Sequence, residues 1–137
     1  MTVALVEDPP AHGQRRFEHM IRVYWEDTDA GGIVFYANYL KFFERARTEW
    51  LRSLGLEQSR LRDTTGGIFV VSETSLRYLQ PARLDDELLG TARLEEGGRA
   101  ALTIAQQASK KHDGVLLSEG TIRIGWVDAQ SLRPARI

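Results

Sequence analysis

One amphipathic segment constrains what this chain can fold into more than any other part of its sequence. Apolar side chains recur there at helical spacing, and charged residues fill the positions between them. Asn38 stands where a helix N-cap is expected, and Gly55 stands where a C′ glycine is expected. The pattern predicts one helix of about 16 residues over 39–54, which must bury its apolar stripe against another surface. The stripe consists of Tyr39, Leu40, Phe43, Ala46, Trp50, Leu51 and Leu54.

Strand-like segments supply that surface. Residues 17–25 alternate in the manner of a first strand, and four β-rich runs follow the helix at 68–80, 88–95, 99–109 and 115–127. Residues 57–67 between helix and sheet are polar and indicate a loop or a short irregular helix. Consecutive hairpins make a sheet mainly antiparallel, so we expect an α+β fold with one long helix packed on five strands.

The length of the chain bounds its domain organisation. With 137 residues and 42% apolar content, it is long enough for one core and too short for two. We assign residues 17–130 to a single domain. Residues 1–16 carry Pro9-Pro10 and Gly13 without periodicity and are expected to form a flexible N-terminal tail. Residues 131–137 are expected to form a C-terminal tail.

Charge and composition exclude several classes of function. Eighteen basic and nineteen acidic side chains give a net charge of −1, which favours neither nucleic acid nor an anionic membrane. No apolar run is long enough to insert in a membrane, and the N-terminus lacks the pattern of a signal peptide, so we expect a cytoplasmic protein. The chain has no cysteine, and its three histidines are scattered, so we expect neither a metal nor another cofactor.

The stretch from Tyr24 to Tyr39 combines acids, glycines and aromatic residues directly before the helix. Asp27 and Asp29 precede Gly31-Gly32, where the backbone can turn sharply. Unpaired N–H groups at a helix start can bind an oxyanion, and a carboxylate beside them makes a minimal acyl-transfer site. A calcium loop is a poor alternative, because Asn38 stands where a bidentate glutamate is required. A plain Asp/Gly turn is the stronger alternative.

The run from Val23 to Leu51, VYWEDTDAGGIVFYANYLKFFERARTEWL, resembles the signature of hotdog-fold acyl-CoA thioesterases. The similarity is to the Tol-Pal-associated and 4-hydroxybenzoyl-CoA thioesterase group, and it covers about residues 17–130. The resemblance implies a hotdog fold and hydrolysis of acyl-CoA to free acid and CoA. It places the catalytic carboxylate at Asp29 and the oxyanion-binding backbone N–H at Tyr36. It also implies substrate contacts at the intervening residues Gly31, Gly32, Ile33, Val34 and Phe35.

One residue departs from part of that group. The Tol-Pal-associated enzymes commonly have histidine at the position of Tyr36, whereas the 4-hydroxybenzoyl-CoA enzymes have tyrosine. A backbone donor survives this change, but an imidazole does not, so the resemblance leaves the acyl group open. Asp27 is interpreted as a brace of the loop, Glu73 as a weaker carboxylate candidate, and Phe42 as a possible wall of an acyl channel.

Two features concern binding partners. The phosphates of CoA need cations, and the candidates are Arg77, Arg83, Lys110, Lys111 and Arg123. A sheet of this size leaves an edge strand that needs covering, so we expect a homodimer, or a homotetramer of two dimers. The acyl carrier is either CoA or acyl carrier protein.

The main alternative function is a non-catalytic hotdog module that binds acyl thioesters or a protein partner. A hotdog hydratase ranks below it, because no histidine lies in the loop.

Overall fold

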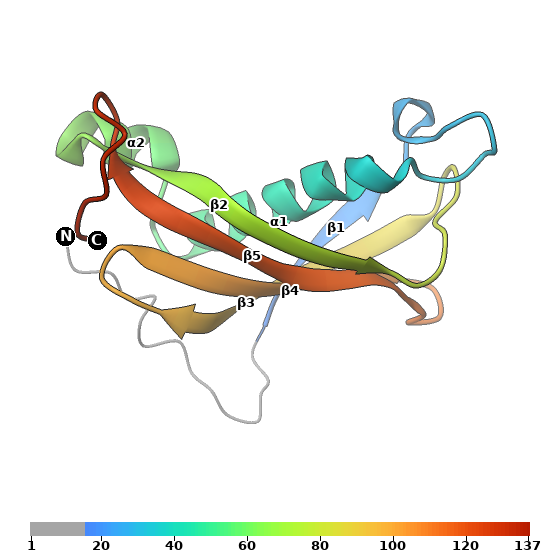
Figure 1. Cartoon of the computed structure of the whole chain (residues 1–137). Coiled ribbons are helices and arrows are strands. Elements are labelled where there is room, and N and C mark those ends of the chain that lie inside the picture. Colours follow the sequence, from blue (N-terminus) through green and yellow to red (C-terminus); the bar gives the residue numbers. More distant parts are fainter. Residues whose placement is uncertain (1–15) are drawn as a thin grey trace.

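The computed structural model describes residues 16–137, so the predicted tail over 1–16 lies outside the described residues except for Arg16. Five strands form one antiparallel sheet in the order β1-β3-β4-β5-β2 (Figure 1). The strands are β1 Phe17–Arg22, β2 Gly67–Tyr78, β3 Glu87–Gly97, β4 Ala101–Lys110 and β5 Leu116–Asp128. Two α-helices, α1 Tyr39–Ser53 and α2 Gln58–Thr65, lie between β1 and β2 in the chain. Short 3-10 turns, η2 Trp25–Asp27 and η3 Tyr36–Asn38, precede α1.

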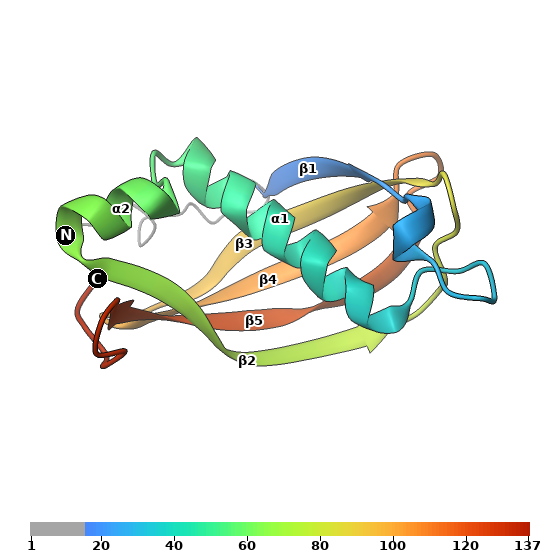
Figure 2. The same cartoon turned by 90° about the horizontal axis from the view of Figure 1, so that it is seen from above.

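Helix α1 crosses one face of the sheet diagonally (Figure 2). It buries Phe42, Phe43 and Trp50 among apolar side chains of the strands. The helix packs against β3, where a Cβ on Gly90 would lie 3.4 Å from that of Ala46. Small residues at this crossing therefore let the helix lie close to the sheet. The predicted α+β architecture of one long helix on five antiparallel strands is confirmed.

The two ends of α1 differ in how well the sequence predicted them. At the C-terminal end, Gly55 adopts a left-handed backbone conformation with φ +83°. The Gly55 N–H donates to the Arg52 carbonyl, and the Leu56 N–H donates to the Leu51 carbonyl. This is a Schellman cap, as a C′ glycine predicts. At the other end the prediction is wrong: Asn38 has helical backbone angles, and its side chain caps no N–H.

The first strand is shorter than its alternation suggests. It ends at Arg22, and Trp25, expected inside it, opens the η2 turn with its side chain 82% exposed. The carboxylate of Asp27 accepts a 2.8 Å hydrogen bond from the Tyr24 N–H, which favours the turn over a continued strand.

The C-terminal residues return along the sheet. Asp128 donates through its N–H to the Arg133 carbonyl, and Ala135 donates to Trp126. The last residue, Ile137, donates to Arg99. Residues 131–137, expected as a tail, are thus bonded to the end of the domain. Within residues 16–137, no helix has the length and apolar character needed to span a membrane.

Candidate active site

The acidic glycine stretch folds into a small hairpin that projects from the end of the sheet (Figure 1). Thr28 and Val34 pair across it, and the Asp29 N–H donates to the Ile33 carbonyl at 2.9 Å. Its turn closes where the Gly32 N–H donates to the Asp29 carbonyl at 3.0 Å, with Gly32 at φ +80°. Glycine is suited to that left-handed backbone conformation because it has no Cβ. The turn expected at Gly31-Gly32 is therefore present.

Asp29 lies at the tip of this hairpin with its side chain exposed. Its Oδ1 accepts a 2.8 Å hydrogen bond from the Gly31 N–H, as in an Asx turn. Its Oδ2 has no hydrogen-bond partner among residues 16–137. One carboxylate oxygen thus holds the turn, and the other is free to act on a ligand.

Asp27, by contrast, is buried and fully engaged. Its two carboxylate oxygens accept from the Tyr24 N–H and from the side-chain amide of Asn38, the latter at 2.7 Å. Its carbonyl accepts from the Phe35 N–H at 3.0 Å. The interpretation of Asp27 as a brace is confirmed, and the same contact explains why Asn38 caps no helix N–H: its amide holds the hairpin instead.

The backbone donors lie where the hairpin enters the helix. Residues 36–53 are helical without a break, first as η3 and then as α1. In the described part of the chain, no acceptor bonds the N–H of Tyr36 or Ala37. Such groups carry the partial positive charge of a helix N-terminus and are suited to an oxyanion.

A hollow of about 240 Å³ opens beside Tyr36. Three predicted site residues, Ile33, Val34 and Tyr36, line it. Asp29, Gly31, Gly32 and Phe35 do not line it. The remaining wall comes from Tyr39, Tyr78, Leu79, Gln80 and Pro81.

Sequence reasoning missed these wall residues. Tyr39 follows Tyr36 by one helical turn, and this spacing is a signal that both side chains share a face. Residues 78–81 reach the hollow only because β2 ends beside the start of α1, which no local pattern indicates. Phe42, suggested as a channel wall, is instead fully buried in the core.

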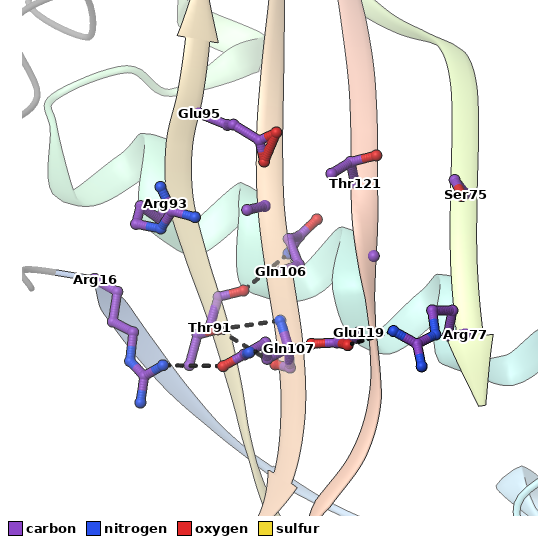
Figure 3. Close-up of a pocket in the computed structure, with 12 residues that line it drawn as sticks. Arg16, Ser75, Arg77, Thr91, Arg93, Glu95, Gln106, Gln107, Glu119 and Thr121 are labelled. Carbon is purple, nitrogen blue, oxygen red and sulfur yellow. Dashed lines mark hydrogen bonds and ion pairs between the residues drawn. The ribbon is translucent and has the colours of Figure 1, made fainter. Parts of the chain in front are cut away.

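The suggested phosphate-binding cations lie in different places. Arg77 pairs with Glu119 at 3.2 Å on the sheet face opposite α1, in a polar hollow of about 470 Å³ that also includes Arg93 (Figure 3). Lys110 and Lys111 line another hollow with Asp85 and Asp86. Of the five candidates, only Arg83 pairs with the acidic hairpin. Its backbone forms an antiparallel bridge with that of Ile33. Glu73 is exposed on β2 opposite Arg123, away from the hollow beside Tyr36.

Residues 16–137 contain no group of three or more His, Cys, Asp or Glu side chains placed to hold a metal ion. The groups that the structure brings together at this end of the sheet are Asp29, the helix-start amides and the apolar hollow.

Comparison with known proteins identifies the family. Residues 31–117 match the model of the thioesterase superfamily. The chain belongs to the thioesterase superfamily. Its curated relatives include the acyl-CoA thioesterase YbgC of Haemophilus influenzae, 39% identical over 86% of this chain and 85% of that protein. The acyl-CoA thioester hydrolase YbgC of Escherichia coli is 37% identical over 86% of this chain and 87% of its own.

Solved structures agree with this membership. A probable thioesterase from Bartonella henselae superposes on this thioesterase with a TM-score of 0.82 at 29% identity, over 90% of this chain and 99% of the other. The family resemblance and the enzyme class predicted from the sequence are confirmed.

Proposed function

We propose that this thioesterase hydrolyses acyl-CoA to a free acid and CoA at the start of α1, in the cytoplasm. The observation that carries the proposal is that the N–H groups of Tyr36 and Ala37 have no acceptor among residues 16–137 and stand at the helix start beside an apolar hollow. A thioester carbonyl bound at these donors would have its acyl group in the hollow. The names of the YbgC relatives, which are 37–39% identical, support CoA thioesters as substrates.

Asp29 supplies the negative charge that the reaction needs. Acting as a general base, its free Oδ2 takes a proton from water, and the water oxygen attacks the thioester carbon. The Tyr36 N–H stabilises the oxyanion of the tetrahedral intermediate. When the intermediate collapses, the carbon–sulfur bond breaks, and the thiolate of CoA takes from Asp29 the proton that came from water. The Tyr36 side chain has no acid or base role in this scheme.

A nucleophilic Asp29 is the second form of the same proposal. Its carboxylate then attacks the thioester carbon, expels the thiolate and forms a mixed anhydride, which water opens. A single turnover in ¹⁸O water detects the nucleophilic form when water opens the anhydride at the Asp29 carbonyl. Label in the Asp29 peptide establishes nucleophilic attack with water entering at the Asp29 carbonyl, whereas direct attack by water leaves the peptide unlabelled.

The leaving group also needs an anchor. Arg83 is the best-placed of the candidate cations, because its backbone pairs with Ile33 of the hairpin while its side chain remains exposed. We assign it to a phosphate of CoA.

The site is proposed to be completed in a homodimer. Strand β2 is an edge of the sheet, with β5 as its one strand partner in the described chain. Its exposed apolar side chains include Val70, Val71 and Tyr78, and the last of these also lines the hollow beside Tyr36. An uncovered apolar edge is suited to pairing with the same edge of a second copy.

A hydrolysis screen tests the function. Acyl-CoAs of graded length and aromatic type, and the corresponding acyl carrier protein thioesters, are incubated with the protein while thiol release is followed. Turnover of CoA thioesters that depends on Asp29 supports the proposal. Binding of these thioesters without turnover would favour the alternative, a non-catalytic binding module.

A further inference from the structure

Two polar side chains interrupt the apolar patterns of α1 and β4 where the helix crosses the sheet. On the face of the sheet that α1 covers, β4 places Leu102, Ile104 and Ala108 in the core, and Gln106 stands among them, 1% exposed. On α1, Arg47 lies between buried apolar residues and is 9% exposed. Periodicity alone calls for an apolar residue at both positions, so the two exceptions need a physical explanation.

The two side chains meet each other. The Arg47 guanidinium donates to Oε1 of Gln106 at 3.1 Å, and the Gln106 amide donates to the Phe43 carbonyl at 3.0 Å. The same amide donates to the Thr91 carbonyl of β3 at 3.3 Å, a bond drawn in Figure 3. Gln106 therefore joins the backbone of α1 to the sheet, and Arg47 fixes the orientation of its amide.

Such a network costs stability in an apolar core. Burial lowers the pKa of the Arg47 guanidinium, and the charge of Glu44 acts in the opposite direction. Among residues 16–137, no carboxylate forms an ion pair with Arg47. Replacing both partners of a buried polar contact by apolar side chains of similar size is often neutral or stabilising. Stability alone therefore does not explain the network.

The hollow beside Tyr36 shows what the network holds in place, because its walls belong to two parts of the fold. Tyr36 and Tyr39 belong to the helical segment, whereas residues 78–81 lie at the end of β2 and directly after it. The width of the hollow therefore depends on how the helix lies on the sheet. Packing of apolar side chains is non-directional and tolerates a small slide of the helix, but a hydrogen bond weakens steeply when its angle changes.

We propose that Gln106 and Arg47 are positioning residues, which hold α1 at one place on the sheet and thereby place the N–H groups of Tyr36 and Ala37 for the reaction. The proposal rests on the proposed function for the role of these two groups. Phe43 lies about two helical turns beyond Tyr36, and the segment between them is helical without a break, so a shift at Phe43 is carried to the helix start. A misplacement of about 1 Å at a reacting group can lower the rate by about 10²-fold.

Gln106→Glu is the first test of this role. Its carboxylate can still accept from Arg47, in a charge-assisted hydrogen bond, but it has no N–H to donate to the Phe43 carbonyl. Steady-state hydrolysis of hexanoyl-CoA and benzoyl-CoA measures the effect. On the substrate that the wild type turns over faster, we expect kcat to fall by about tenfold or more, with KM changed by less than about twofold.

Ile104→Val is the matched control. It removes one buried carbon from the same face of β4 without touching a hydrogen bond. It should lower the midpoint of urea unfolding and keep the wild-type kcat. An equal loss of kcat in Ile104→Val and Gln106→Glu would overturn the proposal, because any loosening of the core would then have the same effect.

The double variant Arg47→Leu/Gln106→Leu keeps the test decisive if Gln106→Glu does not fold. Leucine at both positions leaves neither polar side chain in the core, so the urea midpoint should stay at or above the wild-type value. We expect kcat to fall as in Gln106→Glu. A kcat within about twofold of the wild-type value in either folded variant overturns the proposal. So does failure of both variants to fold, because the network then belongs to the stability of the core.

Amide resonances separate this proposal from the proposed function. The ¹H–¹⁵N signals of Tyr36 and Ala37 report the surroundings of these groups without any substrate. We expect both signals to shift in the two Gln106 variants and to stay in place in Ile104→Val. If no acyl-CoA is hydrolysed by the wild type, the proposed function fails, yet shifted signals still support placement of the helix start by Gln106. Signals that stay at their wild-type positions overturn that placement, whatever the activity.

Discussion

The side-chain amide of Asn38 donates a 2.7 Å hydrogen bond to Oδ1 of Asp27 in a buried contact. This bond ties the first turn of the helical segment to the base of the hairpin that carries Asp29. The position of Asp29 relative to the helix-start amides therefore depends on two side chains that take no part in the proposed chemistry.

Replacing Asp27 by alanine should destabilise the fold. The Tyr24 N–H and the Asn38 amide would both lose their acceptor, and the buried Asn38 amide, left unsatisfied, would cost about 1–3 kcal/mol. We expect a lower midpoint of urea unfolding, with a smaller loss for Asp27→Asn, which keeps one acceptor oxygen. An unfolding midpoint equal to that of the wild type in Asp27→Ala would show that the brace contributes nothing.

Asp29→Asn should leave the fold intact and remove activity. The amide oxygen of asparagine can still accept from the Gly31 N–H, so the turn keeps its bond while the charge is lost. We expect kcat to fall by about 10²-fold or more with little change in substrate affinity, a loss of about 3 kcal/mol in transition-state stabilisation. Steady-state kinetics on the best acyl-CoA measures this.

Two other carboxylates serve as controls for that substitution. Glu73→Gln and Asp27→Asn should reduce kcat much less, because Glu73 lies away from the hollow and Asp27 faces structural donors. Near-normal turnover by Asp29→Asn would make this carboxylate a turn residue and nothing more.

Arg83→Gln should raise the KM for acyl-CoA and weaken its dependence on salt. In the wild type, KM is expected to rise with ionic strength, because screening weakens the contact between a guanidinium and a phosphate. A short pantetheine thioester, which lacks those phosphates, should respond little in either protein. The same salt response for both substrates in the wild type would remove the case for a phosphate site at Arg83.

Gly120→Ala should disrupt the pairing of β2 with β5. A Cβ at this position would overlap the backbone oxygen of Ser75, which requires the two strands to move apart. We expect a loss of about 3 kcal/mol or more in the free energy of unfolding. Gly125 on the same strand is the matched control, because its Cβ would meet nothing closer than 3.8 Å. Equal stability of Gly120→Ala and Gly125→Ala, measured by urea unfolding, would contradict this packing.

Val71→Lys should weaken the proposed homodimer. Val71 is 52% exposed on the edge strand β2, and a lysine on an edge opposes pairing with another chain. Analytical ultracentrifugation should show a larger share of monomer and a matching loss of activity. Val115→Lys, which adds the same charge in the connection between β4 and β5, should sediment like the wild type. A wild-type protein that is fully active as a monomer would refute the homodimer itself.

The sequence by itself determined the elements of this fold. The helical stripe, the cap at Gly55 and the β-rich runs are local patterns, and each depends on residues a few positions apart. The turn at Gly31-Gly32 could be predicted for the same reason, since Asp29, Gly31 and Gly32 form it among themselves. The family resemblance added roles for Asp29 and Tyr36 that no spacing indicates.

Only the tertiary structure decided which of these residues meet. Asn38 has the residue type of a helix N-cap, but its side-chain amide donates a hydrogen bond to the buried carboxylate of Asp27, eleven positions earlier. Tyr39 belongs to the apolar stripe of the helix, yet the end of β2 turns it into a wall of the hollow beside Tyr36. Arg77 and Arg83 both had the charge to bind a phosphate, but Arg77 lies on the sheet face opposite α1, paired with Glu119. These outcomes depend on contacts between distant segments, because strand order and helix packing, rather than local periodicity, decide which side chains share a space.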